Sequence, residues 1–107
     1  RIFLKVSPKV SAYKLAIFPL AANKPELIAK SQELYQNLSK KYSIDYDDSS
    51  SIGKKYRRQD EIGTPWCVVI DYQTLEDNTV SIRDRDTMSQ IRINFDEIDS
   101  WLQKQLN

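Results

Sequence analysis

The 107-residue sequence predicts an α/β fold, in which a mixed sheet of about five strands is flanked by about three helices. Short apolar runs of strand length recur along the chain, and longer segments between them carry apolar residues at every third or fourth position. The strand–helix–strand pattern of residues 13–46 predicts parallel strands, whereas two alternating runs separated by a turn predict an antiparallel hairpin near the end.

The first half of the chain predicts one βαβ unit. Residues 13–18 (YKLAIF) form a dense apolar run that Pro19 ends, which is typical of a central strand. Asn23 and Glu26 have the spacing of a capping box, so a helix with one apolar face is expected to begin there. Residues 43–46 (SIDY) are expected to form the second, parallel strand.

A short basic helix is predicted next. Asp47, Asp48 and the serines at 49–51 supply side-chain oxygens for a turn and an N-cap. Four cations follow within five positions, and Gly63 with Pro65 then ends the helix. Capping explains the two aspartates better than a metal-binding pair does.

The second half predicts a buried strand, a hairpin and a closing helix. Residues 66–71 (WCVVID) are the most continuous apolar run, and residues 72–78 are expected to be a polar connection. Residues 79–85 and 90–94 alternate, so the hairpin should carry apolar side chains on one face and arginines on the other. The spacing of an asparagine and a glutamate in residues 94–97 predicts the start of the closing helix.

Composition excludes several kinds of site. One cysteine, no histidine and two glycines argue against a disulfide framework, histidine chemistry and a glycine-rich phosphate loop. Cys67 lies inside an apolar run and is expected to be a core residue. No run approaches the ~20 apolar residues of a membrane span. No catalytic residue, metal site or cofactor is therefore expected, and with a net charge of +1 a nucleic-acid surface would require segregated charge.

The basic helix is the first candidate nucleic-acid surface. Its cations are candidate phosphate contacts, and Tyr56 or an arginine plane is a candidate for stacking on an unpaired base. The alternative is a solvated helix face on which Arg57 pairs with Asp60 and Glu61. The candidate contacts on this helix are Lys54, Lys55 and Arg58.

The hairpin is the second candidate surface, because its polar face carries Arg83, Arg85 and Arg92. Arginine binds base edges and phosphates through a fork of donors, and a strand fixes the direction of that fork. The alternative is a ladder of cross-strand charge pairs with Asp84 and Asp86. From these residues alone, both interpretations stay open.

Two long runs carry a resemblance to a known family, namely GKKYRRQDEIGTP (residues 53–65) and TLEDNTVSIRDRDT (residues 74–87). Together with the opening KVSPKVSAYKLAIFPL, they resemble the C-terminal anticodon-binding domain of the glycyl-tRNA synthetase family, a class IIa aminoacyl-tRNA synthetase. The resemblance covers nearly the whole chain. It implies that residues 1–12 are a lead-in from an upstream catalytic region and that residues 13–107 are the anticodon-binding domain.

The resemblance implies recognition without chemistry. The domain would bind the anticodon loop of a glycine tRNA, through positions that correspond to Thr74, Leu75, Glu76 and Arg83. Glu76 would accept a hydrogen bond from a cytosine amino group. An upstream class II catalytic domain in the same chain would use ATP and Mg²⁺ to attach glycine. The parent protein would resemble a cytoplasmic homodimer, and an organellar copy stays open.

Two other functions stay open at this point. The domain could reuse the fold as an interaction module without reading an anticodon, as the accessory subunit of a mitochondrial DNA polymerase does. A self-standing enzyme is disfavoured, because the sequence offers no histidine, no glycine-rich loop and only a cysteine inside an apolar run.

Overall fold

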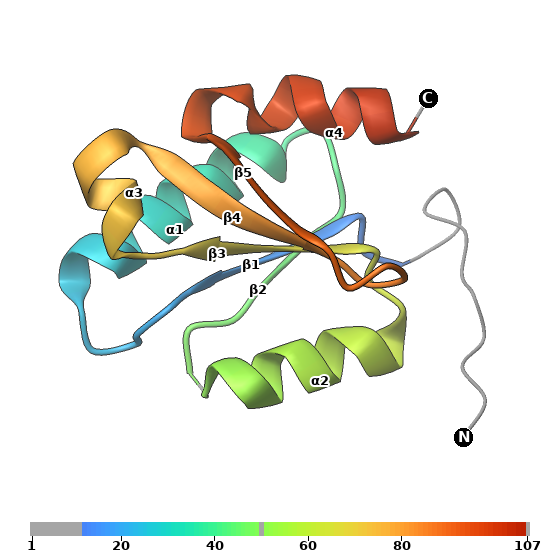
Figure 1. Ribbon diagram of the computed structural model, residues 1–107, viewed down its shortest axis with the longest axis horizontal. Coiled ribbons are helices and arrows are strands. Elements are labelled where there is room, and N and C mark those ends of the chain that lie inside the picture. The colour runs from blue at the N-terminus through green and yellow to red at the C-terminus, as the bar shows by residue number, and fades with distance from the viewer. Residues whose placement is uncertain (1–11, 50, 107) are drawn as a thin grey trace.

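A five-stranded sheet organises residues 12–49 and 51–106, the part of the chain that the computed structural model describes. The strand order is β2-β1-β3-β4-β5, and within these residues four α-helices pack on the two faces of the sheet (Figure 1). The predicted α/β fold with a mixed sheet is confirmed. The predicted lead-in, residues 1–12, falls almost wholly outside the described residues and stays a prediction.

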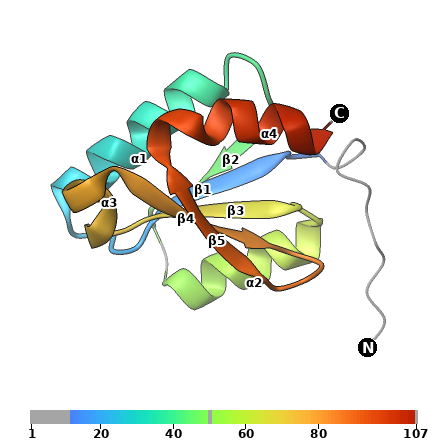
Figure 2. The same ribbon diagram turned by 45° about the horizontal axis from the view of Figure 1, so that its top comes forward.

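The parallel half of the sheet contains the predicted βαβ unit. β1 (Leu15–Pro19) lies between β2 (Ile44–Tyr46) and β3 (Trp66–Ile70), and both pairings are parallel. Every residue of β1 and β3 is buried, which explains why their sequences are continuously apolar. The crossover helices α1 (Pro25–Leu38) and α2 (Ile52–Ile62) cover opposite faces of the sheet (Figures 1 and 2).

The antiparallel half is the predicted hairpin. β4 (Thr79–Asp84) pairs with β3 and with β5 (Gln90–Asn94). Val80 and Ile82 of β4 are 0% and 1% exposed, so the apolar face of the hairpin continues the core. The 3₁₀ helix η1 (Phe95–Glu97) and helix α4 (Ile98–Leu106) then return across that face, beside α1 (Figure 2).

The two faces of the sheet bury different amounts of apolar surface. The face under α1 and α4 holds the larger cluster, whose buried members come from every strand except β5. The face under α2 holds a small cluster of four buried residues, to which two side chains of α2 add. That small cluster does not reach β4 or β5. Its buried members are Ala16, Phe18, Cys67 and Val69.

The capping box predicted for α1 was wrong, although the helix does begin between Asn23 and Glu26. The N-cap residue is Lys24, which makes no side-chain capping bond, and Asn23 lies one position too early to act as the cap. Pro25 begins the helix instead, because its fixed φ suits the first turn and it has no N–H group that needs a partner. Lys24 is extended, as the residue before a proline usually is.

The polar connection predicted for residues 72–78 was also wrong, because it contains helix α3 (Tyr72–Asp77). Asp71 caps this helix through a capping box. Its Oδ1 accepts from Thr74 N at 3.1 Å, and the Thr74 hydroxyl accepts from Asp71 N at 3.0 Å. The helix ends at Asn78, which takes the left-handed conformation with φ 61°. The D-x-x-T spacing was the signal that could have predicted it.

The closing helix starts as predicted at Asn94, but its first turn is η1 rather than α-helix. The Asn94 side chain accepts from Asp96 N at 2.8 Å, and α4 proper begins at Ile98. Phe95, Ile98 and Leu102 are buried against the sheet, as their spacing predicts.

Candidate nucleic-acid interface

The polar side of the β4–β5 hairpin forms an exposed or half-exposed patch on the same sheet face as α2. The register pairs Ser81 with Arg92 and Arg83 with Gln90, so these side chains stand together on one face. Cys67 pairs with Arg83, which places the patch directly beside the small cluster under α2. We call this patch the hairpin platform. Its members are Thr79, Ser81, Arg83, Gln90 and Arg92.

Arg83 is the arginine of the platform whose hydrogen-bond donors are mostly open. Its guanidinium carbon lies 4.4 Å from the centre of the Tyr56 ring, and Nη2 lies 3.1 Å from the Met88 sulfur. The ion pairs among residues 12–49 and 51–106 do not include Arg83. A thioether is only a weak acceptor, so most of the guanidinium edge stays available to a ligand while one side of the group rests against the tyrosine ring.

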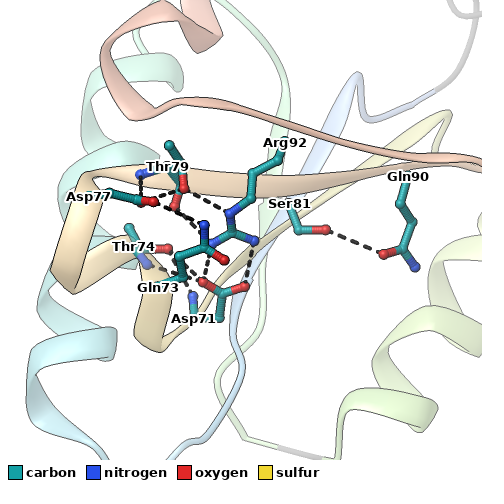
Figure 3. Close-up of polar contacts among 8 residues, drawn as sticks. All are labelled: Asp71, Gln73, Thr74, Asp77, Thr79, Ser81, Gln90 and Arg92. Carbon is teal, nitrogen blue, oxygen red and sulfur yellow. Dashed lines mark hydrogen bonds and ion pairs between the residues drawn. The ribbon is translucent and has the colours of Figure 1, made fainter.

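Arg92, in contrast, is held by a carboxylate (Figure 3). Its Nη1 donates to Asp71 Oδ2 at 2.9 Å, its Nη2 donates to Asp71 Oδ1, and its Nε donates to Thr79 Oγ1 at 2.7 Å. The predicted charge pairs of the hairpin used Asp84 and Asp86, but the partner of Arg92 comes from the start of α3. Arg92 therefore ties β5 to α3 and has few donors left for a ligand.

The electrostatics of this pair follow from its geometry. Burial by itself would raise the pKa of Asp71, but the hydrogen bonds and charge of Arg92, with the hydrogen bonds from Thr74, outweigh burial and lower that pKa. The hydrogen bonds to Asp71 raise the pKa of Arg92 in turn. Both groups are thus charged at neutral pH, and Asp71 serves at once as ion-pair partner and as N-cap of α3.

Arg85 does not lie open on the platform, contrary to the prediction that it faces a ligand. Its side chain is only 11% exposed, with Nη1 paired to Asp86 Oδ1 at 3.1 Å. Its Nε donates to the Asp60 carbonyl at 3.2 Å, and its backbone N–H donates to the Pro65 carbonyl at 2.8 Å. These contacts anchor the hairpin to the end of α2, which is why the side chain is covered.

The three predicted base contacts on helix α3 differ in their exposure to solvent. Thr74 is 2% exposed, and its hydroxyl is engaged by Asp71, so it positions the helix instead of facing solvent. Leu75 is 47% exposed and Glu76 is exposed, so both can reach a ligand. Tyr72, also 47% exposed, is an aromatic of the kind that stacks on bases, and it was missed because no helix was expected here.

The four cations of α2 fall on two different faces of the helix, one buried and one exposed. Ile52, Lys55, Tyr56 and Gln59 recur at the spacing of one helix face, and this face packs on the sheet. Lys55 is 1% exposed, its ammonium donates to the Pro19 carbonyl at 3.3 Å, and it lies 5.7 Å from the centre of the Phe18 ring.

Lys55 is thus a buried residue, contrary to the prediction that it lies on an exposed basic face. Burial lowers the pKa of its ammonium group, and the carboxylates of Asp47 and Asp48 offset part of that change. The three-residue spacing between Ile52 and Lys55 could have predicted that Lys55 lies on the buried face, but the run of cations favoured an exposed basic helix instead.

The remaining cations of α2 point outward. Lys54 and Arg57 are exposed, and Arg58, with a side chain 50% exposed, pairs with Asp45 of β2. The alternative ion-pair network named Arg57 as the partner of acidic residues on its own helix, but the ion pair that α2 makes within the described residues joins Arg58 to a strand. Arg58 keeps half of its surface for a ligand.

Cys67 and the acidic side chains are the other groups in the described residues that could carry chemistry. Burial, with a smaller effect of Asp60, raises the pKa of the Cys67 thiol to about 12, so it is a poor nucleophile at neutral pH. Across the described residues, no three or more acidic or cysteine side chains gather where they could hold a metal ion. None of the helices in that part of the chain is long and apolar enough to span a membrane.

Comparison with known proteins assigns the chain to a family. The family described as "Anticodon binding domain" matches residues 14–105. The chain belongs to the anticodon binding domain family. The resemblance inferred from the sequence is therefore confirmed, and the mixed sheet is that of an anticodon binding domain.

Relatives of this anticodon binding domain carry one enzyme name. The glycine–tRNA ligases of Clostridium tetani, Alkaliphilus metalliredigens and Streptomyces coelicolor are 52%, 50% and 47% identical to it over 106 residues, which is 99% of the chain. The chain spans only 22%, 22% and 23% of the length of those three proteins.

Proposed function

We propose that this domain binds the anticodon loop of a glycine tRNA, as one part of a longer glycine–tRNA ligase. The observation that carries the proposal is the Arg83 guanidinium, which is fixed against Tyr56 yet unpaired with any carboxylate of the described residues. A donor fork of this kind suits the edges of unpaired bases. Relatives of about 50% identity that are named glycine–tRNA ligases support glycine tRNA as the ligand.

Binding divides between phosphates and bases. The exposed cations of α2, Lys54 and Arg57, with the half-exposed Arg58, contact phosphates and hold the loop in register. Arg83 donates to acceptors on a base edge, and Glu76 accepts from a cytosine amino group. Leu75 packs against an unstacked base. Thr74 and Arg85 act indirectly, through the helix and the hairpin that they hold in place.

The chemistry of the parent protein belongs to other parts of its chain. We propose that an upstream class II catalytic domain attaches glycine to the tRNA with ATP and Mg²⁺, in a cytoplasmic homodimer. The present domain supplies recognition. The alternative function, an interaction module that does not read an anticodon, is not supported, because the relatives carry the ligase name.

The test is the affinity of the chain for a glycine-tRNA anticodon stem-loop and for the same stem-loop with its anticodon cytosines replaced. Both are measured at two salt concentrations, because the difference between loops removes most of the sequence-independent phosphate contribution. One good bidentate base contact is worth about 1–3 kcal/mol, so a preference of about 5- to 150-fold for the cognate loop is expected, and Arg83→Ala should abolish most of it.

A matched control separates base reading from loss of charge. Lys104→Ala removes one exposed cation from α4, on the opposite face of the sheet, and should leave the preference unchanged (Figure 1). Equal affinity of the unsubstituted chain for the two loops, falling together with salt, would overturn the proposal.

A further inference from the structure

We infer that Tyr56 is a positioning residue for Arg83, and that a stack of Phe18, Tyr56 and Arg83 sets the geometry with which the hairpin platform reads a base. The inference rests on the proposed function and concerns the same site. It changes the role of Tyr56 from the direct base-stacking contact suggested by the sequence to a support beneath another side chain.

The stack begins in the core. Phe18 of β1 is 0% exposed, and the Tyr56 ring lies at right angles to it, with 5.4 Å between ring centres and an interplanar angle of 86°. Tyr56 also packs on the buried cluster that contains Cys67 and Val69. A ring with these neighbours on a helix has little freedom to turn, so the core fixes the orientation of the tyrosine.

The stack ends at the platform. The Arg83 guanidinium covers the Tyr56 ring at 4.4 Å, and the pairing of β3 with β4 fixes the Arg83 backbone opposite Cys67. The Met88 sulfur, 3.1 Å from Nη2, contacts the guanidinium from the hairpin turn. Because Arg83 occupies the tyrosine ring, the surface left for a ligand is the guanidinium itself rather than the ring.

The two arginines of the platform show why an aromatic support matters. Asp71 holds Arg92 in place, but it uses the donors of that arginine and neutralises its charge. Tyr56 contacts Arg83 through its ring, 4.4 Å from the guanidinium carbon, and is not a hydrogen-bond partner of this arginine among the described contacts. An arginine ordered before binding loses less side-chain entropy when a base arrives, and its donors already point in one direction. Stacking therefore makes Arg83 a selective contact, whereas a mobile Arg83 would bind phosphates and bases alike.

The test compares Tyr56→Phe, which keeps the ring, with Tyr56→Leu, which removes it. The readouts are the preference for the cognate loop, the salt dependence of binding and the unfolding free energy. Tyr56→Phe should keep the preference within ~2-fold, whereas Tyr56→Leu should reduce it by ~10-fold, the scale of one bidentate base contact. The salt dependence should not change in either variant, because the charge of Arg83 remains.

A second measurement does not depend on the leucine variant folding. In the free chain, the side-chain proton resonances of Arg83 should be shifted upfield by the ring beneath them, and Tyr56→Phe should keep that shift. Absence of the shift from the unsubstituted chain would overturn the inference.

The binding outcomes separate this inference from the proposed function. A full preference in Tyr56→Leu overturns the inference alone, because Arg83 then reads the base without support. A preference lost in Tyr56→Phe also overturns it, because the hydroxyl is then the contact. No preference in the unsubstituted chain overturns the proposed function, and this inference with it.

Discussion

The two faces of the sheet differ in the side chains that they carry. The face under α1 and α4 is apolar from β2 to the hairpin, and it holds the larger cluster of buried residues. The face under α2 is apolar only at β1 and β3, and beyond β3 the hairpin platform presents polar side chains. In β4 the two faces differ most clearly, with Ile82 buried on one and Arg83 partly exposed on the other.

This difference explains how the domain can present arginines in fixed positions. A strand alternates its side chains between faces, so burial of Val80 and Ile82 on the far side fixes the backbone that carries Ser81 and Arg83. Platform residues that form no ion pair, such as Ser81, can then be exchanged with little effect on the fold.

The largest effect is expected from the far face. Ile82→Ala leaves a cavity in the larger cluster and should lower the unfolding free energy by about 2–5 kcal/mol, measured by urea denaturation. Its neighbour supplies the control, because Ser81→Ala lies on the platform and should change stability by less than ~0.5 kcal/mol. Equal costs for the two variants would contradict the division between the faces.

The next largest loss of stability is expected at Asp71, the carboxylate that pairs with Arg92 of the platform. Asp71→Asn keeps a good N-cap for α3 but breaks the ion pair with Arg92, so it should cost about 1–3 kcal/mol at pH 7. The folded pKa of Asp71 is lowered, so its stabilisation is present above the unfolded value of about 3.9 and is lost as the pH falls through the folded pKa.

The stability difference between Asp71→Asn and the unsubstituted chain should therefore shrink below about pH 4. Denaturant unfolding at pH 7 and at several acidic pH values measures it. Glu33→Gln makes the same change of charge at an exposed site of α1 and serves as the control. A cost that is constant with pH would show that the ion pair contributes little.

A smaller effect is expected under α2. Lys55→Met replaces a buried ammonium with an apolar group of similar length, and should change the unfolding free energy by less than ~1.5 kcal/mol. RNA affinity should stay the same, whereas Lys54→Met should weaken the binding of cognate and altered loops alike and reduce the salt dependence. If both variants weaken binding equally, Lys55 reaches the RNA and is not confined to the interior.

The smallest expected effect is an increase in the unfolding free energy, at Gly53. Gly53 lies exposed in the first turn of α2, and a Cβ atom there would meet nothing within 4 Å. Gly53→Ala should raise the unfolding free energy by about 0.5–1 kcal/mol, because alanine favours the helix. Thermal unfolding measures the gain. A lower melting temperature would show that the start of α2 is not a regular, unobstructed helix.

Most of the fold could be predicted because its signals are local. The continuous run at Trp66–Ile70 and the alternation of Thr79–Asp84 predicted β3 and β4, and Ser51 and Gly63 marked the ends of α2. The capping residues of α3, Asp71 and Thr74, were also a local signal. A six-residue helix is too short, however, for its apolar spacing to be distinguished from that of a polar loop.

The candidate site was harder to predict, because contacts between distant residues decide which side chains are available. In sequence, Lys54 and Lys55 look equivalent, yet one is exposed and the other is 1% exposed beneath the helix. The hairpin arginines looked equally free, but Arg92 is paired with Asp71 and Arg85 is covered by the end of α2.

For residues 12–49 and 51–106, the sequence by itself determined the strands, three of the four α-helices and the family, because hydrophobic spacing, caps and long matching runs are properties of neighbouring residues. Only the tertiary structure decided that Arg83 is supported by Tyr56 and left with open donors, since that contact joins a helix to a strand far along the chain. Availability for binding depends on what surrounds a side chain after folding, which residue order alone does not specify.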